Sequence, residues 1–512
     1  MKPSPRLLKF LRRALLALAV TATLLAAFVV VENWRGDRAW AAEERALRAR
    51  GEPLDLAAFA TPPIPDERNF FKAPGIADLL ITDLGDLSHR AIRADAFTPL
   101  KENLGAASYI GTVVATSTNY EADGRLRRGI KPESIVVTPG DPMGDWHLAQ
   151  TRLLREKRIT GPLSAEPAEN ILAAMKPVQA VLDAVRLAAR ERPEAWLPMQ
   201  FSTDQPSLNV EFMLTLGKAL DGRAKAELAL GRTDDAFADV VGILGLARST
   251  RAGVPTLLST LVGEALRGIT AAALKGGCRQ HQWNEAQLAT LQNLLIDPTA
   301  FGRFKRTLQM ERIEMIGYLS SPSVSPPPKS GLLEVLFQAH GSVWAHLRRE
   351  AIRLAPIWMP HGWFQQEKVA VSRIVAQMTS ALDDATDQKF PSRLQEVKNL
   401  ADALGKSHSP YHGQASLTAD YLSKSLVRFS EQGNAFDEAV AACALERHRL
   451  ARGSYPATIA ELVPTFIAAV PADVFSGQPL GYTRTPDGGF KLTSLAADGK
   501  SEGKVWVQPG GP

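Results

Sequence analysis

The chain has 512 residues, 45% of them hydrophobic and 22% charged, as in an ordinary folded protein with room for two or three domains. Its formal net charge is +5, and the basic N-terminal residues supply this excess: Lys2, Arg6, Lys9, Arg12 and Arg13. The other basic residues are balanced by the 54 acidic ones. The body of the protein is therefore electrically neutral, which excludes an extended nucleic-acid-binding surface.

An apolar run of 18 residues follows the basic tail at positions 14–31, with Thr21 and Thr23 as its polar members. A helix of this length spans about 27 Å, close to the roughly 30 Å hydrocarbon core of a bilayer. We therefore predict a cytoplasmic tail over 1–13, a transmembrane helix over 14–31, and an exported bulk. The alternative is a signal peptide cleaved at Ala39-Trp40-Ala41, but this site lies too far beyond the apolar run.

Residues 32–87 are predicted to form a juxtamembrane helix over 39–50 and then a proline-rich, extended linker. The next segment, 88–160, has a mixed pattern. Its β-branched runs at 109–117 and 134–138 predict short strands.

Apolar stripes with helical spacing dominate residues 161–430 and predict a helical bundle or irregular solenoid. The clearest pair of stripes lies at 212–228 and 237–244, separated by a break at Gly231-Arg232-Thr233. Two antiparallel helices joined by a glycine turn, within 212–247, resemble one tetratricopeptide-type hairpin. No clean 34-residue period recurs elsewhere, so the sequence predicts one such unit and no regular array.

Further helices are expected in the same segment. They cover 258–276, where Gly276-Gly277 is expected to end the helix, 284–295, a stretch up to about 319, 331–354, 364–386, 392–404 and 415–430. Two capping boxes are predicted, Asn284 with Gln287 and Thr458 with Glu461, in which each side chain accepts from the other residue's backbone N–H.

The C-terminal segment, 431–507, is predicted to be a small α+β module. Its helix carries an apolar face over 436–448. Two short alternating runs, 480–485 and 490–495, flank the sequence Pro-Asp-Gly-Gly, and this arrangement predicts a β-hairpin. The fold class is therefore mainly α, with one transmembrane helix and a small module that contains a hairpin.

The layout of residues 436–500 resembles the C-terminal region of the major pseudopilin of bacterial type II secretion. Three motifs carry this resemblance in the family's order: Tyr455-Pro456, the segment PADVFSGQPLGY at 471–482, and SLAADG at 494–499. Val474 departs from the family's proline, and the N-terminus lacks a pilin-type leader. The resemblance implies a shared fold for this module, whereas shared function does not follow from fold.

Related pseudopilins hold Ca²⁺ in the loop after the last of these motifs. Here Ser494 and Asp498 match the family, and Glu502 lies close in sequence, but no acidic residue follows it and Lys500 and Lys504 add positive charge. Calcium takes six to eight oxygen ligands. We therefore expect that the module keeps the hairpin and has lost the ion.

Two short motifs have known chemical counterparts. Asp383, Asp384 and Asp387 match the DDxxD pattern that holds Mg²⁺ in prenyl-diphosphate enzymes, but without a second acidic motif they predict a solvated helix end. Ser501 and Lys504 fit an SxxK pattern without the partner motifs of that enzyme class, in a tail that we expect to be frayed.

The histidines and cysteines also have plain explanations. His408 and His412 are four residues apart, but Pro410 between them predicts a polar loop, and no third metal ligand is near in sequence. Cys278 and Cys443 are expected to be separate buried small residues.

No catalytic, cofactor-binding or metal-binding residue is assigned from the sequence, and no cofactor is implied. We predict an envelope protein of a bacterial inner membrane, N-terminus in the cytoplasm and bulk in the periplasm, that binds or scaffolds another protein through helical-hairpin surfaces without catalysis. The partners are membrane lipid, through the anchor, and a protein; nucleic acid is excluded. The alternatives are an envelope hydrolase or an accessory subunit of secretion machinery. A deep cleft lined by acids or a histidine favours the hydrolase, and a shallow concave surface favours the scaffold.

Overall fold

The computed structural model describes residues 5–83, 163–198, 206–320, 360–383, 390–406, 409 and 411–510. The chain divides into two compact units, which we treat separately. Unit 1 comprises Met1–Ala58, Leu308–Leu382 and Arg393–Lys424; unit 2 comprises Phe59–Thr307, Asp383–Ser392 and Ser425–Pro512. The fold is mainly helical, with an apolar N-terminal helix and a small C-terminal antiparallel sheet. The predicted strands at 109–117 and 134–138 and the helix at 331–354 lie outside the described residues.

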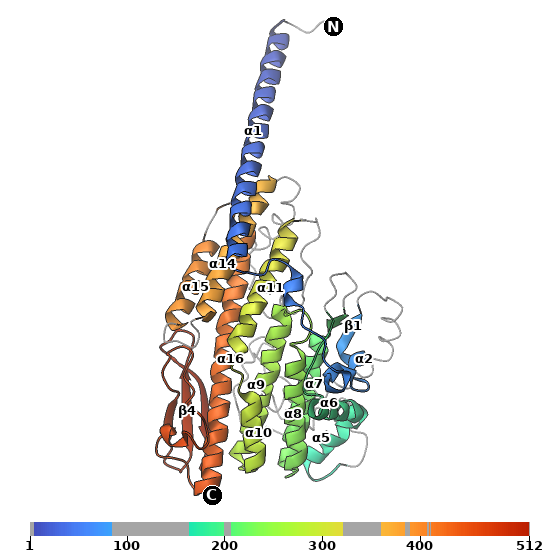
Figure 1. The fold of residues 1–512 in the computed structure, drawn as a ribbon, viewed down its shortest axis with the longest axis vertical. Coiled ribbons are helices and arrows are strands. Elements are labelled where there is room, and N and C mark those ends of the chain that lie inside the picture. Colours follow the sequence, from blue (N-terminus) through green and yellow to red (C-terminus); the bar gives the residue numbers. More distant parts are fainter. Residues whose placement is uncertain are drawn as a thin grey trace. The chain divides into compact units, whose positions relative to one another are not determined.

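Unit 1 begins with α1, Pro5–Ala49, one uninterrupted helix of 45 residues (Figure 1). It contains both the predicted transmembrane segment and the predicted juxtamembrane helix. Side chains along the apolar run face outward: Leu15, Leu24 and Val30 are 64%, 66% and 67% exposed. The helix is thus long and apolar enough to cross a membrane, and its most apolar stretch is not buried against other parts of the protein. Helix α9, Leu257–Arg279, is also long and apolar enough, but 61% of its most apolar stretch is buried.

Helix α1 becomes a packed element directly after the apolar run. Glu32, Gly36, Glu43 and Leu47 are buried on one face. A Cβ atom at Gly36 would overlap the backbone of Gly362, at the start of α14, His361–Asp383. The two helix backbones therefore touch at this pair of glycines, and a larger residue at either position requires them to move apart.

The buried carboxylate of Glu32 stabilises this contact between α1 and α14. It accepts hydrogen bonds from Trp363 Nε1 at 3.0 Å and from the Tyr411 hydroxyl at 2.8 Å, and it pairs with Arg35 at 2.8 Å. The ring of Trp363 also meets Phe28 edge-on, with centroids 6.3 Å apart. A charged side chain at the end of the apolar run is thus satisfied by a specific set of donors.

The other helices of unit 1 are α14, most of α15, Phe390–Gly405, the second part of α11, Ala300–Ser320, and the first part of α16, Gly413–Arg452. Glu367 caps α16 by accepting from the backbone N–H groups of Gln414 and Ala415 at 3.0 and 2.8 Å. The prediction of separate helices at 415–430 and from 436 is wrong, because α16 continues through both for 40 residues.

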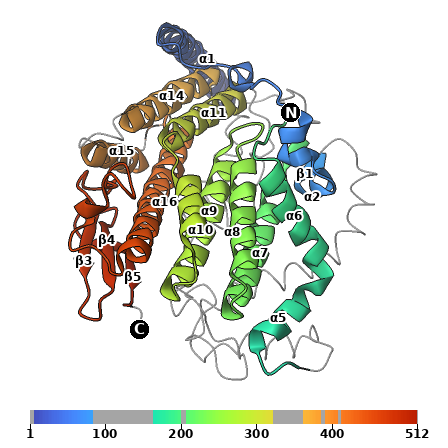
Figure 2. The same ribbon diagram turned by 60° about the horizontal axis from the view of Figure 1, so that its bottom comes forward.

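Unit 2 contains a further set of helices, and the first four of them line the candidate site. They are α5, Pro167–Met175, α6, Gln179–Glu191, α7, Val210–Ala229, α8, Thr233–Ser249, α9, and α10, Glu285–Leu295. Helices α7, α8 and α9 pack against one another, and α6 packs against α8 (Figure 2). The predicted hairpin is confirmed as α7 and α8, and its turn uses Gly231 at a φ of +69°. The capping box of α10 is also present, with Asn284 and Gln287 in the expected roles.

Two expectations in this unit are wrong. Helix α9 does not end at Gly276-Gly277 but continues to Arg279, because Gly277 leaves space for the Trp283 indole, which donates to the Leu274 carbonyl at 2.9 Å. The proline-rich segment is not a free linker. It folds into 3₁₀ turns and short elements: Leu56–Phe59, Asp66–Arg68, Phe70–Lys72, α2 at Ile76–Leu80, and β1 at Ile81–Asp83, which pairs with β2 at Pro206–Leu208.

The C-terminal sheet has the antiparallel order β3-β4-β5 and lies beside α16 (Figure 1). Strands β3, Gly481–Arg484, and β4, Phe490–Leu495, confirm the predicted hairpin. The frayed tail is contradicted, because Glu502–Gln508 forms β5 and buries Trp506 opposite Leu492. The turn at Ile459–Leu462 is a 3₁₀ helix that has the predicted capping box of Thr458 and Glu461.

The sheet is tied to α16 by buried polar contacts. Asp473 accepts from the backbone N–H of Leu495 at 2.5 Å and from Asn434 at 3.1 Å, and Ser494 donates to Glu438 at 2.6 Å. Apolar residues of the sheet, α16, α9 and α10 then form one core. The boundary predicted at 430/431 falls inside α16, and residues of the C-terminal module share a core with the helices before it.

Candidate functional site

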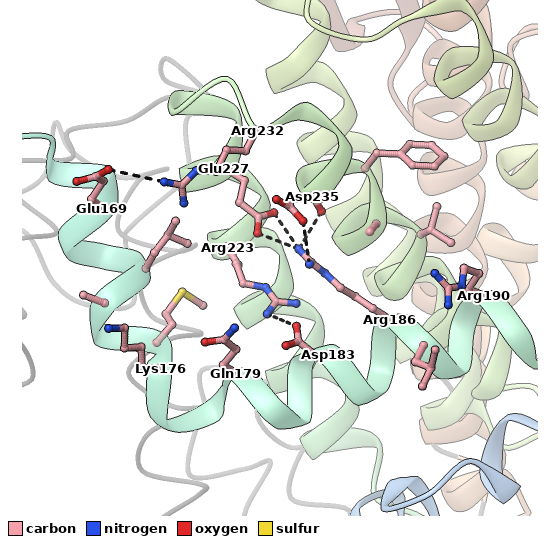
Figure 3. Close-up of a pocket in the computed structure, with 17 residues that line it drawn as sticks. Glu169, Lys176, Gln179, Asp183, Arg186, Arg190, Arg223, Glu227, Arg232 and Asp235 are labelled. Atoms are coloured by element: carbon pink, nitrogen blue, oxygen red, sulfur yellow. Dashed lines mark hydrogen bonds and ion pairs between the residues drawn. The ribbon is translucent and has the colours of Figure 1, made fainter.

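Unit 2 contains a cleft between α5, α6, α7 and α8, with a volume of about 1020 Å³ (Figure 3). Its lining is rich in charge. The charged lining residues are Glu169, Lys176, Asp183, Arg186, Arg190, Arg223, Glu227, Arg232 and Asp235. Apolar side chains complete the walls: Leu172, Met175, Leu187, Phe237 and Val241.

The carboxylate of Asp239 anchors the floor of this cleft. Its side chain is 0% exposed. Arg223 donates to its two oxygens from Nε at 2.9 Å and Nη2 at 2.7 Å, and Arg186 donates from Nε at 2.5 Å. The three residues come from α8, α7 and α6. One buried acid therefore holds an arginine from each of two neighbouring helices.

A second layer of ion pairs lies above Asp239. Arg186 Nη2 donates to both oxygens of Glu227, at 2.9 and 3.0 Å, and to the backbone carbonyl of Asp235 at 2.8 Å. Arg223 Nη1 donates to Asp183 at 2.8 Å. The two arginines thus face four carboxylates: Asp239, Glu227 and Asp183 accept hydrogen bonds from them, and Asp235 lies 3.6 Å from Arg186. Burial and complete pairing are the conditions under which such a network fixes the relative positions of helices.

The environment of Glu227 changes its acidity. Burial and the nearby carboxylate of Asp239 raise the pKa of Glu227 to about 8, against the opposing effect of Arg186. Burial lowers the pKa of Arg186, but Asp239 and Glu227 more than offset it, so the pKa stays above its ordinary value. A carboxyl group that titrates near neutral pH has the acidity of a general acid or base. Here both of its oxygens contact an arginine instead of facing a reactant.

The rim is more exposed and carries both signs of charge. The side chains of Arg190, Asp235, Arg232 and Glu169 are 73%, 60%, 48% and 45% exposed. Lys176 directly follows α5 and lies at the edge of the cleft (Figure 3). The arrangement has a floor of paired charges, apolar walls and a rim of both signs of charge, which suits an extended ligand with both polar and apolar groups.

Among the described residues, none of the candidate metal-binding or catalytic motifs of the sequence lines this cleft. Asp383 pairs with Lys305 at 2.7 Å with its side chain 60% exposed, while Asp384, Asp387 and His408 lie outside the described residues. The backbone N–H of His412 donates to the Ser409 carbonyl at 3.2 Å. Within the described residues, no group of three or more His, Cys, Asp and Glu side chains is arranged to hold a metal ion.

Cys278 and Cys443 are both buried free thiols. They lie in one apolar core, and burial raises the pKa of each thiol, which keeps both groups protonated. The structure therefore agrees with two buried small residues that form no disulfide.

The oxygens considered for calcium have other partners. Ser494 donates to Glu438, Glu502 pairs with Lys491 at 2.6 Å, and Asp498 accepts from the backbone N–H groups of Lys500 and Ser501 at 2.9 and 2.8 Å. The loss of the ion stays a prediction, and these contacts give it a physical basis.

Arg186, Arg223, Glu227 and Asp239 were not identified from the sequence. One signal was available: Arg223 and Glu227 lie within the apolar stripe of α7, where a charge requires a partner. The partner itself comes from other helices and cannot be read from local spacing. No family model, curated protein or solved structure matches the chain.

Proposed function

We propose that this chain is a membrane-anchored binding protein whose cleft between α5, α6, α7 and α8 receives a segment of another polypeptide. The observation that carries the proposal is the cleft of about 1020 Å³, which has a paired floor, apolar walls and a rim of both charges. Its volume is at the upper end of the roughly 300–1,000 Å³ typical of small-molecule pockets.

The chemistry of the lining favours a polypeptide over a charged small molecule. The floor offers no free arginine to a small anion, because Arg186 and Arg223 are already paired with carboxylates. Leu187 and Phe237 provide apolar surface on α6 and α8, while Lys176, directly after α5, offers a cation at the edge. A peptide segment supplies apolar side chains, amides and charges together. Covering the floor of the cleft costs little desolvation free energy, because the polar groups there already have hydrogen-bond partners.

A hydrolase is the second candidate, and the feature expected of a hydrolase, a cleft lined by acids, favours it: Glu169, Asp183, Glu227 and Asp235 line the cleft. The binding role is favoured because Glu227 and Asp183 accept from arginines, and a general acid or base must instead lie within hydrogen-bond reach of its reactant. The two candidates differ in their response to Glu227→Gln, which removes proton transfer but keeps the side-chain shape. A hydrolase loses its turnover, whereas a binding protein keeps its partner.

The anchor is part of the same proposal. We place residues 14–31 of α1 in a bacterial inner membrane, with the N-terminus in the cytoplasm and the remainder in the periplasm, from the basic tail and the exposed apolar run. The packing of Glu32 and Gly36 in unit 1 supports a retained anchor over a cleaved signal. An accessory role in secretion machinery is a further proposal from the C-terminal motifs, supported by the hairpin β3–β4.

Site-specific photo-crosslinking in cells tests the cleft. A photo-crosslinking amino acid replaces Leu187, which is 44% exposed on the cleft wall, or Thr290, which is exposed on α10, as the matched control. We expect discrete polypeptide adducts from position 187 and none of the same mass from position 290.

A reversal of rim charge sharpens this test. Arg190→Glu changes an exposed rim side chain without touching Asp239 or its partners, so the fold should persist while the position-187 adducts weaken. If positions 187 and 290 give the same crosslinked products in the same yield, or if position 187 crosslinks to lipid and to no polypeptide, the ligand of the cleft is not a polypeptide.

A further inference from the structure

Helix α14 runs parallel to α1 directly beyond the apolar run of the anchor (Figure 1). Four contacts between the two helices follow the same order along both: Gly362 with Asn33, Gln365 with Asp37, Lys368 with Trp40, and Arg373 with Glu43. The first turn of α14 is therefore its end nearest to the apolar run, and the rest of α14 leads away from it.

The contacts of Trp363 place this first turn at the height where the apolar run ends. Its ring meets Phe28 with centroids 6.3 Å apart, and its Nε1 donates to Glu32 at 3.0 Å. Phe28 lies three residues before Val31, the last residue of the run, and Glu32 directly follows it. At a rise of 1.5 Å per residue, Phe28 is about 4–5 Å inside the end of the run. Trp363 therefore contacts residues on both sides of the boundary.

The same rise places Trp34 in the headgroup layer of a bilayer. This layer is about 5–7 Å thick on each side, half the difference between the full bilayer and its hydrocarbon core. Trp34 lies about 4–5 Å beyond Val31, and it is 60% exposed. Tryptophan is enriched in this layer, because its ring is apolar and its N–H group is polar.

The side chain of Arg38 folds back along α1 toward the apolar run. Its guanidinium carbon lies over the Trp34 ring, 5.5 Å from the ring centroid, so it lies about one helical turn nearer to the run than its own position in the sequence. Within the described part of the chain, Arg38 has this ring contact and no ion pair. One guanidinium group is thus available to an anion at the height of the lipid headgroups.

The neighbouring charges do not form a broad positive surface. Arg35 pairs with Glu32 at 2.8 Å. The Asp37 carboxylate lies 3.8 Å from His361 Nε2 and accepts from Gln365 at 3.2 Å. A soluble polyanion is therefore a poor fit, whereas a bilayer that contains the apolar run brings lipid phosphates next to Arg38.

We propose that Trp34, Arg35 and Arg38 on α1, with His361 on α14, form a headgroup-contact surface on which Arg38 binds the phosphate of a phospholipid. This inference rests on the membrane placement of residues 14–31 in the proposed function. It adds that the first turn of α14 lies in the bilayer surface. A guanidinium group packed on an aromatic ring is preorganised for such a contact, and its hydrogen bonds to phosphate are charge-assisted.

Electron paramagnetic resonance of the full-length protein in phosphatidylcholine vesicles tests the position of this surface. A nitroxide label is attached to the cysteine of His361→Cys, at a side chain that is 51% exposed. The matched control is Arg48→Cys, whose native side chain is 66% exposed and which follows Trp34 on α1 by about 21 Å. The two natural cysteines are buried and do not compete for the label.

A nickel chelate carried on some lipid headgroups should shorten the relaxation time of the label at position 361. The label at position 48 should keep a relaxation time close to its value without nickel. A third label, at Leu24→Cys inside the apolar run, should be relaxed by dissolved oxygen and not by a water-soluble chelate. Thermal melting confirms folding of each variant, and Trp34→Cys replaces His361→Cys if that variant does not fold.

The label at Leu24→Cys separates failure of the anchor from failure of this inference. If the water-soluble chelate relaxes it, the anchor is wrong and this inference fails with it. If it lies in hydrocarbon while headgroup nickel acts equally at positions 361 and 48, the anchor stands and this inference is overturned.

The role of Arg38 is measured by native mass spectrometry of the detergent-solubilised protein with added phosphatidylglycerol. Arg38→Gln should lower the apparent affinity for this lipid about fivefold, the effect of one basic side chain at a lipid surface. Arg45→Gln is the matched control and should leave the affinity unchanged. Arg45 is exposed on the same face of α1 and lies about 10 Å further from the apolar run. Equal affinities of the wild-type protein and both variants would show that Arg38 binds no lipid phosphate.

Discussion

Replacing Asp239 by alanine should lower the free energy of unfolding by about 3–5 kcal/mol, the usual cost of breaking a buried ion pair from one side. The carboxylate is fully buried and accepts from both Arg186 and Arg223, so its loss leaves two charged groups in the floor of the cleft without their shared partner. Chemical denaturation of the detergent-solubilised protein, followed by circular dichroism, measures this change.

Asp235→Ala is the matched control. Asp235 has the same charge on the same helix, but its side chain is 60% exposed and lies 3.6 Å from Arg186. An exposed pair of this kind contributes up to about 1 kcal/mol. Equal effects of the two substitutions would mean that Asp239 does not hold the helices together. Asp239→Leu combined with Arg223→Met should recover part of the lost stability, because no charge of that pair then stays buried and unpaired.

Leu228→Asp should destabilise the protein by more than about 4 kcal/mol, because a carboxylate would replace an apolar side chain in a close-packed core. Leu228 is 0% exposed and packs in the core formed with residues of α8, α9 and α10. The expected result is loss of the cooperative thermal transition at the wild-type temperature.

The equivalent change at Val241 should have a smaller effect, about 1–2 kcal/mol, the range of ordinary substitutions. The stripe pattern predicts Val241 as a core residue facing α7, but the structure places it, half-buried, on the wall of the cleft. There an introduced carboxylate can be hydrated. Equal loss of stability in both variants would show that the cleft is closed at this wall.

The sequence predicted elements best where local chemistry decides them. The turn at Gly231, the capping boxes at Asn284 and Thr458, and the hairpin at 481–495 each rest on neighbouring residues, and all are present. The long helix α16 was missed at Gly433, a residue of low helix propensity. Its neighbour Asn434 contacts Asp473 and Val474, so tertiary contacts hold the helix together where propensity is poor.

Strand β5 and the cleft were missed for a related reason. The alternation of apolar and polar residues in 502–508 is short and lies among glycines and lysines. It indicates a strand only once the pairing of Trp506 with Leu492 on β4 is known. The floor of the cleft joins residues that are 16 and 53 positions apart in the chain, Asp239 with Arg223 and with Arg186. Such pairs depend on helix packing, which a single sequence does not encode in local form.

The whole of α1 is expected to stay in the mature protein, because Glu32 and Gly36 precede the potential cleavage site at Ala39-Trp40-Ala41 and pack within unit 1. Removal of the helix before this site would take away the carboxylate that Trp363 and Tyr411 contact. We therefore expect that the membrane anchor and the part of α1 that contacts α14 stay in the same polypeptide.

The direct measurement is the intact mass of the protein recovered from membranes after washing with alkaline carbonate. We predict that the protein stays in the membrane fraction with residues 14–31 still attached, and that protease added outside the inner membrane digests the bulk of the chain. Recovery of the mature protein as a soluble form that begins near Ala42 would contradict this account.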